Sequence, residues 1–137
     1  MKKHLSEQDQ AMCQKVIQQT EAQIAIWRDL VDICSTNDVD KCTKKQKKID
    51  QQCHDFIETI KHETNDFRKH SQHCGHYACL VACKEFLQSF DKCLADSYAC
   101  MQYSQADSPA TSGAAVACID SSTALINACN KCLEVKE

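Results

Sequence analysis

Apolar positions recur along most of the chain at alternating steps of three and four residues. The first series consists of Cys13, Ile17, Thr20, Ile24, Trp27, Val31 and Cys34. This spacing places side chains on one face of an α-helix, because two helical turns take about seven residues. No segment alternates with a period of two, so the pattern predicts helices and no strands.

Three later series of the same kind predict three more helices. The second series is Cys42, Gln46, Ile49, Cys53, Phe56, Ile60, Glu63, Phe67, His70 and Cys74. The third is Cys79, Cys83, Phe86, Phe90, Cys93, Ser97 and Cys100. The fourth is Ala114, Cys118, Ser121, Leu125, Ala128 and Cys132. Each series defines one buried face, which we call a seam.

Turn residues separate the four periodic segments. Residues 35–40 form a polar run, Gly75 follows the second segment as a helix-terminating glycine would, and Ser108-Pro109 is typical of a helix start. The expected helices span 6–34, 41–73, 76–104 and 110–135. Short connections make consecutive helices antiparallel. We therefore predict an all-α fold: one domain over 1–137, an antiparallel up-down four-helix bundle with a cysteine-lined core.

Cysteine is the unusual component, at 12 of 137 residues. Every cysteine except Cys129 falls on a seam, and Cys129 is predicted to lie beside one. Antiparallel packing should gather one group at the first and last turns, namely Cys34, Cys42, Cys100 and Cys118. Cys53 and Cys93 should lie nearer the middle. The other end should hold Cys13, Cys74, Cys79, Cys83, Cys129 and Cys132, together with His70, His73 and His76.

Composition and charge exclude several functions. The net charge of −3 gives no basic footprint for nucleic acid, and no segment approaches the ~18 apolar residues of a membrane span. The chain has neither paired catalytic carboxylates nor a glycine-rich phosphate loop, so we do not expect an enzyme. The charged start has no apolar run after it, which favours the cytoplasm. A secreted or periplasmic chain whose signal peptide has been removed is the alternative.

Clustered thiols in a reducing compartment favour metal binding. Thiolate is a preferred ligand of Cu(I). Cys79 and Cys83 lie one helical turn apart, and Cys129 and Cys132 offer a similar pair. All twelve cysteines are candidate ligands, with His70 and His73 as a site where an ion first binds. Zn(II) held by the cysteines at the first and last turns is the alternative metal.

Six disulfides are a second interpretation. Cys34–Cys42 and Cys100–Cys118 would close two hairpins, and Cys53 could join Cys93. Each bridge would contribute about 2–4 kcal/mol to stability. In that case the chain would be a secreted or periplasmic interaction protein without a cofactor.

The segment from His70 to Glu134 resembles the cysteine-rich four-helix-bundle copper storage proteins. The resemblance rests on His70-Ser71-Gln72-His73-Cys74, on Cys79 and Cys83, on Cys93 to Cys100, on Asp107-Ser108-Pro109, on Ala117-Cys118 and on Cys129-Asn130-Lys131-Cys132. It implies storage of several Cu(I) ions in the bundle interior. The implied ligands are Cys74, Cys79, Cys83, Cys93, Cys100, Cys118, Cys129 and Cys132. A copper chaperone is a candidate partner, and a homo-oligomer is compatible with the sequence.

Overall fold

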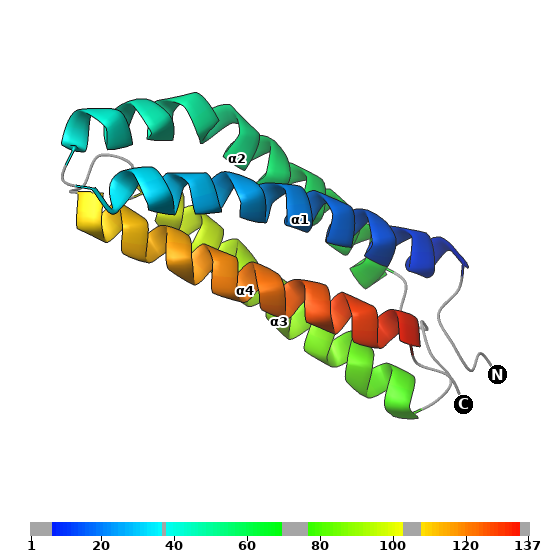
Figure 1. Cartoon of the computed structure of the whole chain (residues 1–137). Coiled ribbons are helices and arrows are strands. Elements are labelled where there is room, and N and C mark those ends of the chain that lie inside the picture. Colours follow the sequence, from blue (N-terminus) through cyan, green and yellow to red (C-terminus); the bar gives the residue numbers. More distant parts are fainter. Residues whose placement is uncertain (1–6, 37, 70–76, 103–107, 135–137) are drawn as a thin grey trace.

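A computed structural model describes residues 7–36, 38–69, 77–102 and 108–134, with the backbone alone at 77–80, 102, 108 and 109. Four helices make up nearly all of this part of the chain (Figure 1): α1 (Glu7–Cys34), α2 (Val39–Lys69), α3 (Tyr77–Gln102) and α4 (Ser108–Glu134). The described residues contain no strand. The predicted all-α four-helix bundle is therefore confirmed, with helix ends within four residues of those expected from the sequence.

The four helices run alternately up and down, so each lies antiparallel to the next in the chain (Figure 1). Helix α4 packs most extensively against α1 and α3, whereas α2 rests mainly on α1. Helices α2 and α3 contact each other least among the sequential neighbours. The side of the bundle between α2 and α3 is therefore its most loosely closed face.

Local hydrogen bonds explain where α1 ends and α2 begins. The hydroxyls of Ser35 and Thr36 donate to the carbonyls of Asp32 and Ile33, which have no partner within the helix. The Asp38 carboxylate accepts a hydrogen bond from the Lys41 amide at 3.1 Å, as an N-cap residue does. This cap starts α2 at Val39, two residues before the predicted start at 41.

The buried seams follow the predicted ones with small shifts of phase. Val16, Leu30 and Thr64 are buried where the sequence pattern placed Ile17, Val31 and Glu63 on the seam, and Ala115 is buried in place of Ala114. The shift has a geometric cause: a straight helix with 3.6 residues per turn drifts by about 20° per heptad. Glu63 lies instead at the surface side and forms an ion pair with Lys15 at 2.7 Å.

The core combines a few large aromatic side chains with many small polar and sulfur-containing ones. The rings of Trp27 and Phe56 pack edge to face with their centroids 5.5 Å apart, and the ring centroids of Phe67 and Phe86 are 5.4 Å apart. The remaining volume is shared between aliphatic side chains, such as Ile57, Ile60 and Leu125, and smaller cysteine, threonine and serine side chains. All ten cysteines whose side chains are described are buried. Cysteine therefore occupies space that Leu, Ile and Val fill in ordinary bundles.

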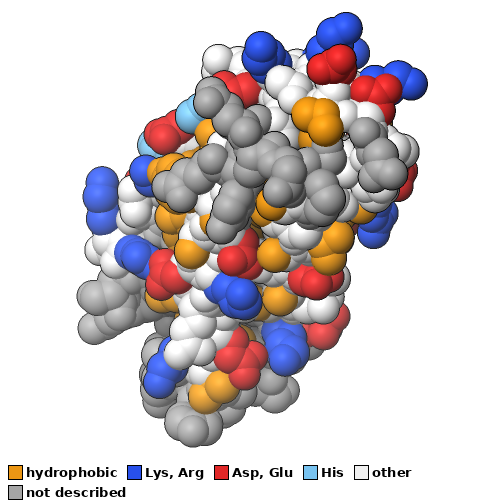
Figure 2. All heavy atoms as spheres, turned by 90° about the vertical axis from the view of Figure 1, so that its left-hand side faces the viewer, with side chains coloured by type: hydrophobic (Ala, Val, Ile, Leu, Met, Phe, Trp, Pro, Cys, Tyr) orange, Lys and Arg blue, Asp and Glu red, His pale blue; other side chains and the backbone are white. Residues whose placement is uncertain are grey.

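The described surface carries many charged side chains, with exposed apolar residues such as Val39 and Val116 among them. Seen from the end that carries the turn between α1 and α2, acidic and basic side chains are interspersed with small apolar patches (Figure 2). None of the described helices combines the length and apolar character that a membrane crossing requires. The unusual chemistry of this protein thus lies in its interior.

Candidate metal centre

Four buried cysteines meet near the end of the bundle where α1 starts and α4 ends. We call this group the thiol cluster: Cys13 from α1, Cys83 from α3, and Cys129 and Cys132 from α4. Cys13 and Cys129 are fully buried, and Cys83 is 7% exposed. The cluster matches the prediction that these cysteines share one end. It also corrects the placement of Cys129, which lies inside the core rather than beside the seam because the buried face of α4 is two residues wide at Ala128 and Cys129.

Hydrogen bonds connect the cluster thiols in a chain. The hydrogen-bonding pairs are Cys83 with Cys132, Cys132 with Cys13, and Cys13 with Cys129. The Cys132 thiol donates to the Ala82 carbonyl at 3.2 Å. Pairwise contacts thus connect sulfurs from three different helices.

These contacts keep three of the cluster thiols protonated. The hydrogen bond with Cys129 is the main reason that the pKa of Cys13 lies above its usual range. The hydrogen bond with Cys132, followed by burial, likewise raises the pKa of Cys83. The hydrogen bond with Cys13 raises the pKa of Cys132 to about 12. At neutral pH Cys13, Cys83 and Cys132 are therefore neutral thiols, which would lose their protons to a bound cation.

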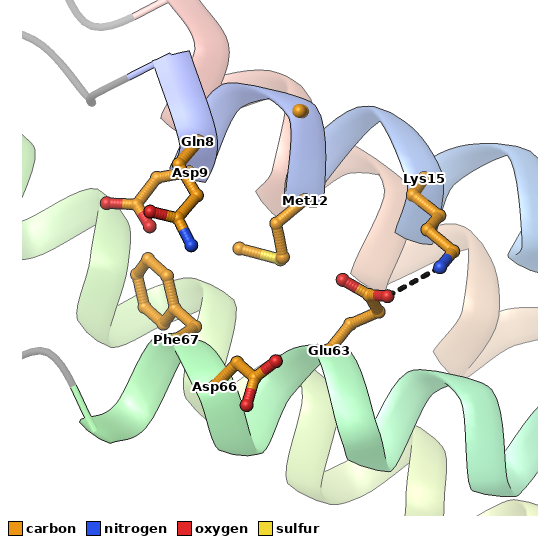
Figure 3. Close-up of a pocket in the computed structure, with 8 residues that line it drawn as sticks. Gln8, Asp9, Met12, Lys15, Glu63, Asp66 and Phe67 are labelled. Carbon is orange, nitrogen blue, oxygen red and sulfur yellow. Dashed lines mark hydrogen bonds and ion pairs between the residues drawn. The ribbon is translucent and has the colours of Figure 1, made fainter.

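An open hollow of about 260 Å³ lies next to the cluster, between the start of α1 and the end of α2 (Figure 3). Met12, which directly precedes Cys13, points into it together with Phe67. The Lys15–Glu63 ion pair lies at its margin. Asp9, which also lines the hollow, is close enough to Cys83 for its negative charge to contribute to the raised pKa of that thiol.

The two cysteines near the middle of the bundle have polar partners of their own. The Gln23 amide donates to the Cys53 sulfur at 3.2 Å, and Cys93 lies 3.4 Å from the Ser122 hydroxyl. Burial raises the pKa of Cys53 to about 11, against the opposing effect of the Gln23 hydrogen bond. Burial also raises the pKa of Cys93. Neither thiol belongs to the thiol cluster.

At the opposite end, Cys34 and Cys42 are joined by a disulfide with a Cα–Cα distance of 4.7 Å. The bond closes the turn between α1 and α2, and in this state neither sulfur is a thiolate ligand. Cys100 and Cys118 are free, and their thiols form a hydrogen bond between α3 and α4. Both pairings were expected from the antiparallel geometry.

Several predicted residues fall outside what the structure describes. His70, His73 and Cys74 lie outside the described residues, and Cys79 is described only as backbone in the first turn of α3. The role of the histidines in binding an ion therefore stays a prediction. Conversely, the sequence pattern missed Gln23 and Ser122, the polar partners of the central thiols. Each directly adjoins a seam position, so a seam two residues wide would have included both.

Within the described part of the chain, no three His, Cys, Asp or Glu side chains converge to hold a single metal ion. The thiol cluster is a chain of pairwise contacts. Comparison of the chain with protein-family models, with curated proteins and with solved structures found no match.

Proposed function

We propose that this bundle binds Cu(I) ions as cargo through the thiol cluster and thereby stores them. The observation that carries the proposal is the hydrogen-bonded chain of Cys83, Cys132, Cys13 and Cys129 in the core. Sulfur is the ligand atom that best suits a soft, monovalent cation. Cu(I) is also stable with two sulfur ligands, so each pair of touching thiols offers the ligands that one ion needs.

Charge balance favours several ions over one. Four thiolates with a single Cu(I) would leave a net charge of about −3 in the core, and burying charge is costly. One ion at each contact of the chain, at Cys83–Cys132, Cys132–Cys13 and Cys13–Cys129, would reduce it to about −1. We therefore expect the cluster to take up about three ions, with Cys13 and Cys132 each bridging two of them.

The surroundings suit a store rather than a catalytic metal site. The ligands come from helices that pack closely on α4, so the cluster is shielded from water and from competing ligands. Burial also slows the release of a bound ion. The Met12 thioether, adjacent in the chain to Cys13, adds a further soft group at the neighbouring hollow.

A titration of the fully reduced protein with Cu(I), in the absence of oxygen and against a competing Cu(I) chelator, tests this function. We expect the protein to withhold about three equivalents from the chelator before the chelator complex forms. If the chelator takes up Cu(I) from the first addition, the thiols are not a copper store.

The Cys34–Cys42 disulfide favours a second candidate, a bundle stapled by disulfides that acts as an interaction protein. The two functions differ in the state of the thiol cluster. Alkylation of denatured protein prepared without reductant, followed by mass spectrometry, distinguishes them. The copper store requires free thiols at Cys13, Cys83, Cys129 and Cys132, as in the structure. Disulfides at these positions would favour the stapled bundle.

A further inference from the structure

A small hollow on the loosely closed face between α2 and α3 reaches into the core beside two free thiols. It has a volume of about 20 Å³, and Cys53 of α2 and Cys100 of α3 line it together with Met101. Asp50, an exposed residue, lies at its outer side. The hollow therefore connects the surface with the interior at the end of the bundle opposite the thiol cluster.

The size of the hollow limits what can reach these thiols. A hollow of at least about 10–15 Å³ is needed to hold one water molecule. The observed volume admits a molecule of the size of water or hydrogen peroxide. A bulky oxidant such as the disulfide of a tripeptide is too large for it.

A second thiol, that of Cys118 on α4, lies next to Cys100. Cys118 donates a hydrogen bond to the Asp96 carbonyl at 3.1 Å, and its sulfur lies within hydrogen-bonding reach of the Cys100 sulfur. The contact with Cys118 lowers the pKa of Cys100 and so favours its thiolate, which is the form that attacks an oxidant. Cys118 does not line the hollow, so an oxidant that enters meets Cys100 before Cys118. A thiol that meets the oxidant and a neighbour that resolves the product are the two parts of a redox-sensitive pair.

We propose that Cys100 is oxidised by hydrogen peroxide and that Cys118 then forms a disulfide with it, linking α3 to α4. The Cys100 thiolate attacks one peroxide oxygen. An S–O bond forms, the O–O bond breaks, and hydroxide leaves and takes up the proton that Cys100 released. Cys100 is oxidised to a sulfenic acid and the peroxide is reduced.

The second step uses no further oxidant. The Cys118 sulfur attacks the Cys100 sulfur, so the S–S bond forms and the S–O bond breaks. The departing oxygen leaves as water with the proton of Cys118. In total, two thiols and one hydrogen peroxide yield one disulfide and two molecules of water.

After the reaction, each of the two hairpins would be closed by its own disulfide at the same end of the bundle. Cys34–Cys42 already closes the turn between α1 and α2, and the new bond would connect α3 and α4 at the same end. None of the four cluster thiols takes part. The oxidation is therefore independent of Cu(I) binding, and either proposal stands if the other fails.

Peptide mapping of the full chain tests the proposal. Reduced protein receives one equivalent of hydrogen peroxide, remaining thiols are blocked with a maleimide, and a protease that cleaves before aspartate separates Cys100 (peptide 96–106) from Cys118 (peptide 107–119). We expect these two peptides to become linked. A maleimide on both cysteines, or a link from 96–106 to the Cys53 peptide 50–54, would overturn the proposal.

Three variants establish the order of the steps. Cys118→Ser should lose the link and accumulate a sulfenic acid at Cys100, which dimedone traps. Cys100→Ser should leave Cys118 unmodified, and dimedone labelling of Cys118 in this variant would contradict the assignment. Cys93→Ser is the matched control, because Cys93 is another buried α3 thiol and lies outside the hollow, and it should keep the link. The peptide mapping uses the chain without substitutions, so it still tests the proposal if one of the variants fails to fold.

Discussion

Cys132 is the thiol whose loss should damage the copper store most. It contacts both Cys13 and Cys83, so the substitution Cys132→Ser leaves only the Cys13–Cys129 contact of the chain. With one ion at each contact, we expect the capacity of the cluster to fall from about three Cu(I) ions to about one.

The same substitution should disturb the fold only slightly. Cys132 is 2% exposed, and its sulfur lies 3.2 Å from the Ala82 carbonyl. A serine hydroxyl at this position can donate to the same carbonyl, so the new polar group has a partner. We expect a loss of about 1 kcal/mol in the free energy of unfolding, the order of a single hydrogen bond or a small packing change.

A Cu(I) titration against a chelator measures the capacity, and urea unfolding followed by circular dichroism measures the stability. Cys93→Ser is the control, because it makes the same sulfur-to-oxygen change at a buried site outside the cluster. It should lose similar stability and keep the full copper capacity. Equal losses of capacity in the two variants would refute the assignment of the store to the thiol cluster. Cys132→Ala provides a second test should the serine variant unfold.

Three further predictions concern protons and buried polar groups. Because Cys13, Cys83 and Cys132 have raised pKa values, Cu(I) binding should release about one proton from each of these thiols that becomes a ligand, measurable with a pH indicator; uptake without proton release would mean that the thiols are not the ligands. Cys53 has a pKa of about 11 in the fold against 9.0 as its ordinary value, so the unfolded state loses this proton first as the pH rises. Stability should then fall by about 2–3 kcal/mol between about pH 9 and about pH 11 relative to Cys53→Ala in urea unfolding, and parallel curves for the two proteins would contradict this. Thr20 is fully buried and its hydroxyl has no hydrogen-bond partner among the described residues. Thr20→Val should therefore raise the free energy of unfolding by about 1 kcal/mol, and a lower thermal midpoint would show that the hydroxyl has a partner.

The sequence predicted the architecture because its signals are local. Seams spaced by three and four residues determine the helices, and the short polar segments determine the antiparallel order. That order alone places Cys34 opposite Cys42 and Cys100 opposite Cys118, as the structure has them. The sequence predicted less accurately which residue of each helical turn is buried, for example at Ile17 and Glu63. The buried face of a straight helix shifts gradually around its axis, and the extent of this shift depends on how the helix packs.

The contacts among the thiols could not be predicted in the same way. Whether Cys13 meets Cys129 or Cys132 depends on the rotation of α4 against α1, and that rotation is set by the whole interface. The small hollow beside Cys100 exists because α2 rests mainly on α1 and approaches α3 less, a property that no residue of α3 reveals. Spacing thus predicts which thiols share an end of the bundle, and packing decides which of them touch.

X-ray absorption at the copper edge tests the central claim most directly. The reduced full chain is loaded with one Cu(I) per chain, so that only the tightest site is filled. The thiol cluster predicts sulfur as the only atom bound to copper, both in this protein and in the Cys93→Ser control. Nitrogen or oxygen atoms bound to copper at this loading would contradict the assignment and would place the ion at histidine or carboxylate groups instead.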